Sequence, residues 1–443
     1  MSEPLNVAVV GLGYVGSCIA GTLADRGANV IGVDTDDTLI EELHRGYSRF
    51  REQELQEILV SSMAAGRLRV TTDPSAVTEA DVVLITVGTP VLEDGSLSDG
   101  QLSSACLSLS EHIRPGQLLI LKSTVPPGTT RTLVKSLLER SGLVGGVDFQ
   151  LAFAPERLAE GAALAELRTF PIVVGGLDEA STQAAVDFLG AALGVPIMPQ
   201  DSLEAAEIVK LADNWWIDLN IALANELAKF CDLFDVDVLD VISAANSIPK
   251  GNGRINILLP SIGVGGSCLT KDPWMVWQSA KKRGLEILTA PAGRQVNATM
   301  PDYTVQAILE GLTTQGLDPA ASTIAVLGLA FKNNTGDLRA TPTYGVVTAL
   351  AKAAAQVRIY DPLVDPAHAT ELFGIKPAAS LEEAVQDADC VAILAFHRDF
   401  EDVDLAALPV SAHCLIIDGR AYLSKQRITE LRESGLAYRG IGR

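Results

Sequence analysis

The chain has 443 residues, of which 48% are hydrophobic and 20% charged, a composition typical of folded globular proteins and not of disordered ones. This length exceeds one ordinary core and predicts two or three domains. The net charge of −21 argues against nucleic acid as a partner, no uninterrupted apolar run is long enough to span a membrane, and six scattered cysteines without a CxxC motif indicate reduced thiols in the cytoplasm.

A glycine motif follows the first predicted strand, at residues 6–10. Gly11-Leu-Gly-Tyr-Val-Gly16 comes directly after it, then a helix predicted over 17–26 and a second strand over 29–33 that ends in Asp34. Such glycines give a tight turn and let a pyrophosphate approach the backbone, while the acid accepts from a ribose hydroxyl and repels a 2′-phosphate. The pattern therefore predicts NAD rather than NADP; the alternative is a similar unit that binds FAD or no ligand. The residues assigned to the cofactor are Gly11, Gly13, Tyr14, Val15, Gly16 and Asp34.

Three further strands, predicted over 81–87, 118–121 and 150–153, each lead into a polar loop. Ligands bind at the carboxyl edge of such sheets. The first loop carries Thr89 and the second Thr124, which could touch the nicotinamide end or simply start a helix. The third loop, residues 154–161, carries Glu156 and Glu160; either could instead be a solvated surface acid. Another strand is predicted at 172–174.

The sequence changes character near Ser202, which has the position of a helix cap. From there to Phe234 the chain has no Gly or Pro, and its apolar residues recur at intervals of three and four. A helix of this length could bridge two domains and form a dimer face. Lys210 and Asn214 would project from one side of it, although a solvated lysine and a polar surface residue remain the alternative.

The loop Gly263–Pro273 follows a second predicted helix at 238–245 and a polar segment that contains Arg254. Gly265 and its neighbour allow unusual backbone angles and close approach to a ligand. Cys268 comes shortly after, and Lys271 could favour its thiolate form and so create a nucleophile. The alternative is a free cysteine buried at a tight turn. Helix is expected again after this loop to about residue 310, with a break at Pro291.

A second α/β unit begins at residue 323, with strands predicted over 323–331, 356–360, 390–394 and 414–417 and a helix over 343–355. It has no glycine motif. Lys332 and Arg339 lie in a polar loop after its first strand and suit phosphate binding, unless they are two solvated cations. The predicted fold class is α/β, with two Rossmann-like, doubly wound parallel-sheet domains at 1–200 and 318–443 and a central helical domain at 201–310.

Six motifs together resemble the nucleotide-sugar 6-dehydrogenases, the family of UDP-glucose, UDP-N-acetylhexosamine and GDP-mannose dehydrogenases. They are GLGYVG at 11–16, STVPPGT at 123–129, APERLAEG at 154–161, KLADN at 210–214, GVGGSCLTKDP at 263–273 and LGLAFKNNTGDLR at 327–339. The resemblance implies that the chain oxidises C6 of a nucleoside-diphosphate hexose twice, with two NAD and one water, through a thiohemiacetal and a thioester on Cys268.

The resemblance also implies roles for single residues. Lys210 and Asn214 would stabilise an oxyanion, while Asp272 and Thr124 would hold water or move protons. Glu160 and Glu156 would serve acid–base steps or hydrolysis, and Lys271 would touch cofactor or substrate. The substrate-binding set is Glu156, Arg157, Leu158, Lys210, Asn214, Arg254, Gly265, Lys332 and Arg339, and Thr89, Thr124 and Lys271 join the cofactor set. No metal is expected. The partners implied are a nucleoside-diphosphate sugar and a second copy of the chain.

Some features depart from the family pattern. Leu39 stands where relatives often carry a Lys or Arg, five residues after the ribose acid. The APER sequence resembles the N-acetylhexosamine branch, whereas Glu160 and Lys271 resemble the glucose enzymes. The sugar therefore stays open among UDP-glucose, a UDP-N-acetylhexosamine and dTDP-glucose. The competing functions are a two-electron hydroxyacid dehydrogenase, which would not need Cys268, and an inactive nucleotide-sugar-binding protein, which would not need an intact set of catalytic side chains.

Overall fold

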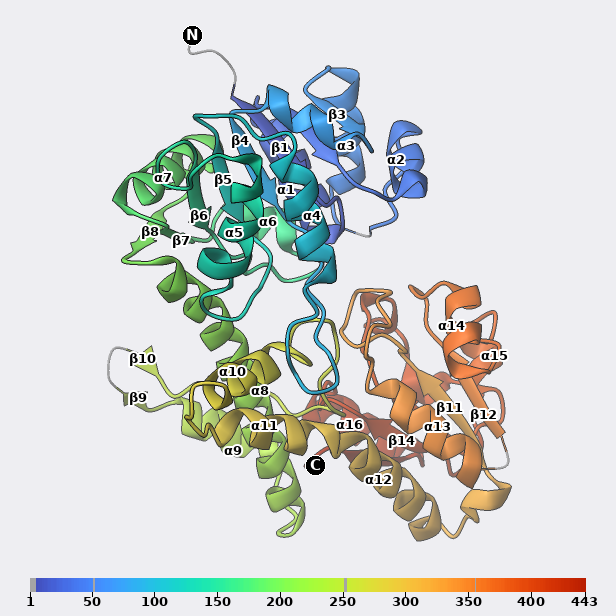
Figure 1. Ribbon diagram of the computed structural model, residues 1–443. Helices are drawn as coiled ribbons and strands as arrows, with labels where there is room; N and C mark the ends of the chain where they lie inside the picture. Colours follow the sequence, from blue (N-terminus) through green and yellow to red (C-terminus); the bar gives the residue numbers. More distant parts are fainter. Residues whose placement is uncertain (1–4, 51, 251–252, 355) are drawn as a thin grey trace. The chain divides into compact units, whose positions relative to one another are not determined.

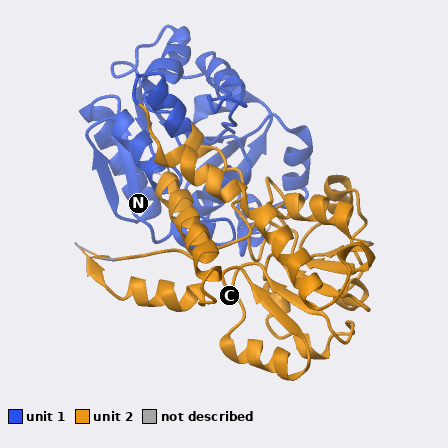
Figure 2. Ribbon diagram, turned by 90° about the horizontal axis from the view of Figure 1, so that it is seen from below, with its two compact units in different colours: residues 1–213, 275–285 blue, residues 214–274, 286–443 orange. Residues whose placement is uncertain are grey.

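The computed structural model describes residues 5–50, 52–250, 253–354 and 356–443. Its contacts divide the chain into two compact units (Figure 2). Unit 1 comprises residues 1–213 and 275–285, and unit 2 comprises residues 214–274 and 286–443. Each unit contains one α/β sheet, so the two predicted sheets and the fold class are confirmed. The long helix α8 (Leu203–Asp232) begins in unit 1 and ends in unit 2 (Figure 1).

The sheet of unit 1 has eight strands in the order β3-β2-β1-β4-β5-β6-β7-β8. They are β1 (Asn6–Val10), β2 (Asn29–Val33), β3 (Leu68–Thr71), β4 (Val82–Ile85), β5 (Leu118–Leu121), β6 (Gln150–Phe153), β7 (Ile172–Gly176) and β8 (Ile197–Gln200). The first six run parallel, in the order of dinucleotide-binding folds; β7 is antiparallel to β6 and parallel to β8. The order in which strands are added to the sheet reverses between β1 and β4, which are themselves parallel. Such a switch point places the ligand crevice at the carboxyl ends of these two strands.

Helices cover both faces of this sheet, as alternation along the buried strands requires. Val7 and Val9 pack with one helical layer, and Ala8 and Val10 with the other. The first layer holds α1 (Tyr14–Asp25), α2 (Asp37–His44), α3 (Leu55–Ala64), α6 (Ala163–Leu167) and α7 (Glu179–Leu193), and the second holds α4 (Gly100–Ser110) and α5 (Lys135–Leu138). A wide π-helical turn, Thr130–Val134, leads into α5.

The central helices agree with the periodicity. Ser202 caps α8, since its Oγ accepts from Ala205 N at 3.1 Å, and the helix runs for 30 residues. The elements that follow are α9 (Val238–Asn246), β9 (Pro249–Lys250), β10 (Gly253–Arg254), α10 (Asp272–Lys281), α11 (Thr289–Ala298) and α12 (Met300–Thr314). The predicted break at Pro291 is wrong, because Pro291 lies in the first turn of α11, where a missing N–H costs nothing. The helices part instead between 281 and 289, where Gly284 has φ +78°.

Unit 2 has a fully parallel sheet in the order β12-β11-β13-β14-β15. Its strands are β11 (Thr323–Leu327), β12 (Gln356–Tyr360), β13 (Cys390–Ile393), β14 (Leu415–Asp418) and β15 (Ala437–Gly440). One face carries α12, α13 (Thr343–Ala353) and α14 (Pro366–Phe373), and the other carries α15 (Leu381–Val385) and α16 (Lys425–Glu433). Here the order in which strands are added reverses between β11 and β13. The loops that follow these two strands therefore flank the crevice.

Along the described part of the chain, no helix combines the length and the apolar character that crossing a bilayer requires.

Candidate active site

The glycine motif forms the turn between β1 and α1 in unit 1. Gly11 has φ +94°, and a Cβ on Gly16 would lie 1.8 Å from the Gly11 carbonyl oxygen. A Cβ on Gly13 would meet no atom within 4 Å, so its surface is open to a ligand. The motif thus leaves the backbone at the start of α1 accessible to a pyrophosphate, which the helix N-terminus favours.

Asp34 lies beside this turn, at the end of β2. Its carboxylate accepts from Leu12 N at 2.6 Å and from Asp36 N at 3.0 Å. The side chain is half-exposed, and a carboxylate has about four acceptor positions, so two remain for ribose hydroxyls. Thr86, at the end of β4, donates from Oγ1 to the Gly11 oxygen at 2.6 Å and closes the turn from the other side. These residues fit NAD in the crevice between β1 and β4.

Leu39 takes no part in this crevice. Its side chain is 4% exposed in the core, and its N–H donates to Asp36 at the first turn of α2. Leu39 therefore contributes to core packing and cannot make the charged contact that a Lys or Arg at this position could make. Val15 also packs against this core, and Thr89 is buried at the end of the β4 loop.

Tyr14 fastens the glycine turn to the loop 154–161. Its hydroxyl donates to Glu52 Oε2, and Gly161 N donates to the same oxygen at 2.8 Å. Burial and the Glu52 hydrogen bond raise the pKa of Tyr14 far above its usual value, so the phenol keeps its proton. The loop that carries Glu156 and Glu160 is therefore held at the cofactor edge of unit 1.

Glu156 pairs with a buried lysine that sequence reasoning did not select. Lys122 Nζ lies 3.2 Å from Glu156 Oε2 and donates to Ala154 O at 3.0 Å, and its side chain is only 3% exposed. The ion pair is not aligned as a hydrogen bond, and within the described ranges Oε2 has no other donor, so it can accept from a water or a substrate hydroxyl. The only signal for Lys122 in the sequence is a cation that directly follows a buried strand.

Arg157 and Leu158 serve the loop itself. Arg157 donates to the Pro171 carbonyl and lies 3.6 Å from Asp213, and Leu158 packs against the core. The assignment of these two residues to substrate therefore rests on the resemblance alone.

Helix α8 brings two charged side chains into the interior one turn apart. Glu207 is fully buried and accepts from Gly128 N at 2.5 Å, Thr130 N at 2.9 Å and Thr130 Oγ1 at 2.6 Å. Its carboxylate thus caps the helical segment that follows the Thr124 loop. Lys210 is 7% exposed, and in the part of the chain that the structure describes its ammonium forms no ion pair or hydrogen bond.

The predicted reactive loop and α8 meet at Asp272 in unit 2. Asp272 is 0% exposed; Lys271 Nζ donates to its Oδ1 at 2.5 Å, and Asn214 Nδ2 donates to its Oδ2. Its own N–H donates to the Cys268 carbonyl at 2.9 Å, so Cys268 stands at the first turn that leads into α10. Lys271 was predicted either to favour the thiolate or, by the resemblance, to touch cofactor or substrate; the structure pairs its ammonium with Asp272.

Cys268 differs from the other five cysteines. It is exposed, whereas Cys18, Cys106, Cys231, Cys390 and Cys414 are buried. Burial raises the pKa of Cys106 and Cys414 to about 12, so those thiols stay protonated. Cys268, the cysteine that the sequence motif selects, is therefore the one whose thiol is accessible at the surface.

The two glycines before Cys268 have a packing role. A Cβ on Gly265 would lie 2.5 Å from Phe331 Cβ, and Gly266, with φ +83°, donates its N–H to the Arg339 carbonyl at 2.9 Å. We predicted that these glycines admit a ligand; what the structure shows is that they admit the loop 331–340 of the second sheet.

The two cations predicted in the loop 331–340, Lys332 and Arg339, differ in their exposure. Arg339 is ion-paired with Asp337 at 2.5 Å and is 56% exposed, while Lys332 is half-buried. Arg420, which follows β14, donates to the Phe331 carbonyl, and in the described residues its buried Nε has no partner. Arg420 is a further candidate that the sequence reading missed. For Arg254 the structure describes only the backbone, in β10.

The chain just before the loop Gly263–Pro273 is anchored at Ser261 by buried polar side chains. Ser261 N donates to Asn225 Oδ1 at 2.7 Å, and Asn225 Nδ2 donates to Asn297 Oδ1 at 2.9 Å. Asn297 and Arg294 both donate to Asp218, at 2.8 Å and 2.7 Å. This network ties α8, α11 and the segment that precedes Cys268 into one rigid support.

The glycine turn, the ribose acid and the strand order define an NAD-dependent oxidoreductase. Family models agree along most of the chain: the UDP-glucose/GDP-mannose dehydrogenase family matches as its NAD binding domain at residues 5–189, its central domain at 204–299 and its UDP binding domain at 325–425. The chain belongs to the UDP-glucose/GDP-mannose dehydrogenase family.

Individual relatives span the full chain. UDP-N-acetyl-D-mannosamine dehydrogenase of Pyrococcus horikoshii is 34% identical over 441 residues, which is 99% of each chain. The solved structure of the Pyrococcus horikoshii enzyme superposes with a TM-score of 0.89 at 33% identity, covering 99% of each chain. A UDP-glucose dehydrogenase from Pyrobaculum islandicum gives a TM-score of 0.88 at 31% identity and covers 100% of this chain and 98% of that one.

Glu207 generates a prediction about pH and stability. Burial raises its pKa to about 7 from the ordinary 4.5, against the pull of the Thr130 and Gly128 hydrogen bonds. Between these values the folded chain binds more protons than the unfolded chain, so this group makes stability fall as pH rises. We expect Glu207→Gln to flatten the dependence of the urea midpoint on pH in this interval, while a lost acceptor costs about 1–3 kcal/mol.

The matched control is Glu204→Gln on the same helix. The pKa of Glu204 is lowered, first by its hydrogen bond from Arg131, so its stabilising effect is present above its ordinary pKa and is lost as pH falls. That variant should leave the slope near neutral pH unchanged. An unaltered slope in Glu207→Gln would contradict the assignment.

Proposed function

We propose that this chain catalyses the four-electron, NAD-dependent oxidation of the C6 hydroxyl of a UDP-hexose to the uronate, with UDP-N-acetyl-D-mannosamine as the first candidate substrate. The observation that carries the proposal is the exposed Cys268, whose carbonyl accepts from the amide of the buried Asp272, itself bonded to Asn214. A two-electron dehydrogenase has no use for such a thiol.

The proposed reaction balances in four steps. The C6 alcohol loses a hydride and a proton to give an aldehyde, and the Cys268 sulfur adds to its carbon to give a thiohemiacetal. Loss of a second hydride and a proton forms a thioester, which is a good acyl donor. Water adds, the C–S bond breaks, and the carboxylate leaves with the thiol restored. When bound, NAD supplies the hydride acceptor for both oxidations.

Lys210 and Asn214 are proposed to stabilise the negative charge that develops on oxygen. They lie four residues apart on α8, so their side chains leave the helix on the same side. A buried ammonium without a partner in the described chain is costly unless a ligand supplies the counter-charge. Preorganised donors of this kind act most strongly where water is excluded. Asp272 is proposed to orient Asn214 and to accept protons during addition and hydrolysis.

Glu156 and Glu160 are proposed to serve hydrolysis and proton transfer, together with a water held by Thr124. The free acceptor position on Glu156 Oε2 supports this role for Glu156, and the ion pair with Lys122 would orient its carboxylate. The fixed loop 154–161 gives both glutamates a defined place in unit 1.

The nucleotide is proposed to bind to the second sheet, in the segment that matches the UDP binding domain of the family. Lys332, Arg339, Arg420 and Arg254 are the cations proposed for the diphosphate and sugar, with Gly265, Arg157 and Leu158 nearer the hexose. In this proposal the domain at 1–200 binds the cofactor, and the domain at 201–310 carries catalysis and dimerisation. The domain at 318–443 binds the nucleotide. The N-acetylmannosamine relative favours an N-acetylated sugar; UDP-glucose and dTDP-glucose are the alternatives. With six free cysteines, we propose the cytoplasm as the location.

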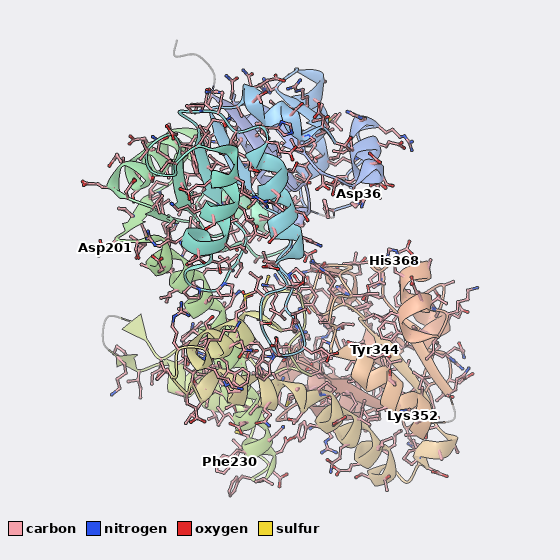
Figure 3. The ribbon with its side chains drawn as sticks, in the orientation of Figure 1. Asp36, Asp201, Phe230, Tyr344, Lys352 and His368 are labelled. Atoms are coloured by element: carbon pink, nitrogen blue, oxygen red, sulfur yellow. The ribbon has the colours of Figure 1, made fainter. Side chains whose placement is uncertain are left out.

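We further propose a homodimer through α8. Trp216, Leu223 and Phe230 recur at seven-residue intervals on this helix and are 49%, 51% and 58% exposed. Phe230 projects from the last third of α8 (Figure 3), and its ring lies 5.1 Å from that of Phe234. A continuous apolar stripe of this kind is typical of a surface that a second helix covers.

The proposed chemistry predicts a stoichiometry. Incubation with UDP-N-acetyl-D-mannosamine, UDP-glucose and dTDP-glucose in turn should release two NADH per uronate formed with one preferred sugar. NADH is counted by absorbance and the product by mass. One NADH per sugar would support a two-electron enzyme, and no turnover of any of them would support a binding protein.

A second prediction isolates the thiol. Cys268→Ser should lower the rate of uronate formation by roughly a thousandfold or more and leave an adduct or aldehyde-level product, since an alkoxide is a poorer nucleophile and leaving group. The control is Cys231→Ser, at a cysteine that is buried in a cluster with Val238 and Met300. Normal release of two NADH by Cys268→Ser would remove Cys268 from the mechanism.

The dimer prediction uses one substitution on the stripe. Leu223→Glu should shift the sedimenting species to the mass of one chain, because a carboxylate cannot be buried between two apolar helices. Leu372→Glu, at a leucine on α14 that is 37% exposed, is the matched control and should sediment like the wild type. Unchanged sedimentation of Leu223→Glu would refute this interface.

A further inference from the structure

The second sheet repeats the backbone framework of the cofactor site. Leu329 N, just after β11, donates to Asp361 Oδ2 at 2.6 Å, and Leu363 N donates to Asp361 Oδ1 at 2.8 Å. Leu12 and Asp36 make the corresponding bonds to Asp34 in unit 1. In both units an acid at the end of the second strand thus braces the turn after the first strand.

The two acids differ in what else they hold. Asp361 also accepts from Ala330 N, from Val364 N and from His397 Nε2, the last at 3.0 Å. The side chains of Asp361 and His397 are both 0% exposed. Burial would raise the pKa of Asp361, but the His397 hydrogen bond and the backbone amides outweigh it and leave the pKa below its ordinary value. Asp361 is therefore an ionised, saturated acceptor with no position left for a ribose.

The other nitrogen of His397 faces a backbone donor. Asn334 N donates to His397 Nδ1 at 2.9 Å. A nitrogen that accepts from an N–H carries no proton, so the ring proton is on Nε2 and points to Asp361. His397 thus links Asp361 to the main chain of the loop 331–340.

Asn334 lies where the two loops of the crevice are joined. Its φ is +58°, a left-handed angle that its local contacts must hold. Its Oδ1 accepts from Arg398 N at 2.8 Å, and the neighbouring Asn333 Oδ1 accepts from Phe396 N at 3.0 Å. These bonds and the one to His397 interleave the loop after β11 with the loop after β13, on the two sides of the point where the strand order reverses.

The same loop reaches the reactive segment. Phe331 N donates to the Asp337 carbonyl at 3.2 Å and closes the loop, and the Arg339 carbonyl accepts from Gly266 N at 2.9 Å. A shift of the 331–340 backbone would therefore move both Lys332 and the glycines that precede Cys268.

We propose that His397 is a positioning residue for the nucleotide sugar: by accepting from Asn334 on Nδ1, it holds the loop 331–340 in the conformation that presents Lys332 to the diphosphate, while its bond to Asp361 keeps the ring proton on Nε2. This inference rests on the proposed function, since it assigns the nucleotide to the second sheet. His397 itself touches neither substrate nor cofactor in this assignment, and it takes the place that a ribose hydroxyl would occupy at Asp361.

Two conservative variants separate the two bonds. In His397→Asn the amide oxygen replaces Nδ1 and keeps the acceptor for Asn334. In His397→Gln the amide nitrogen replaces Nε2 and keeps the donor to Asp361. We expect His397→Gln to raise the KM for the nucleotide sugar and the Kd for UDP by roughly five- to tenfold, the effect of one lost hydrogen bond, with the KM for NAD unchanged. His397→Asn should stay within about twofold of the wild type for all three.

Amide hydrogen exchange of residues 331–340 should rise in His397→Gln alone. The thermal midpoint of each variant shows whether it is folded, and it would fall equally for both if His397 only stabilised the unit. Equal KM values for sugar in wild type and His397→Gln, or a parallel rise in the KM for NAD, would overturn the inference. If the wild type oxidises no nucleotide sugar but binds UDP with this His397 dependence, the proposed function fails and the inference stands.

Discussion

The pairing of the buried Asp272 carboxylate is the interaction on which the arrangement of the segment around Cys268 depends. A charge removed from water must be fully paired, and here a lysine and an asparagine provide the pairing. Because the partners come from the loop itself and from α8, this requirement ties the first turn of α10 to the central helix. Cys268 belongs to that turn, so the place of its sulfur follows from the solvation of a carboxylate four residues later.

The same constraint recurs along α8. Glu207, Asp218 and Asn225 are all buried on this helix, and each binds a different segment: the turn at 128–130, helix α11 and the start of the reactive segment. An amphipathic helix that merely bridged two sheets would bury leucines at these positions. Buried polar groups must find their partners, so they fix the register of the loops more strictly than apolar contacts would. The helix therefore serves as a frame that sets loop positions.

Hydrophobic periodicity and turn residues predicted the strands of both sheets except β3, β8 and β15, and they predicted the long helix and its cap, because these depend on local spacing. The glycine motif predicted the cofactor edge, because only glycine fits where a Cβ on residue 16 would strike the preceding turn. Tertiary partners lay beyond this reach. Nothing near Lys271 in the sequence distinguishes a thiol from a carboxylate as its partner, and Lys122 and Glu207 are selected only by contacts with distant segments. Pro291 was misjudged because a proline breaks a helix interior but suits a first turn.

The two sheets show how one framework can acquire two roles. Both brace the turn after the first strand with an acid at the end of the second, yet Asp34 keeps acceptor positions open while Asp361 is enclosed by a histidine and four amides. A ribose could satisfy the first acid and could not displace the bonds of the second without exposing a buried charge. Discrimination between cofactor and substrate nucleotide can thus reside in whether that acid is already satisfied, here by four amides and a buried imidazole.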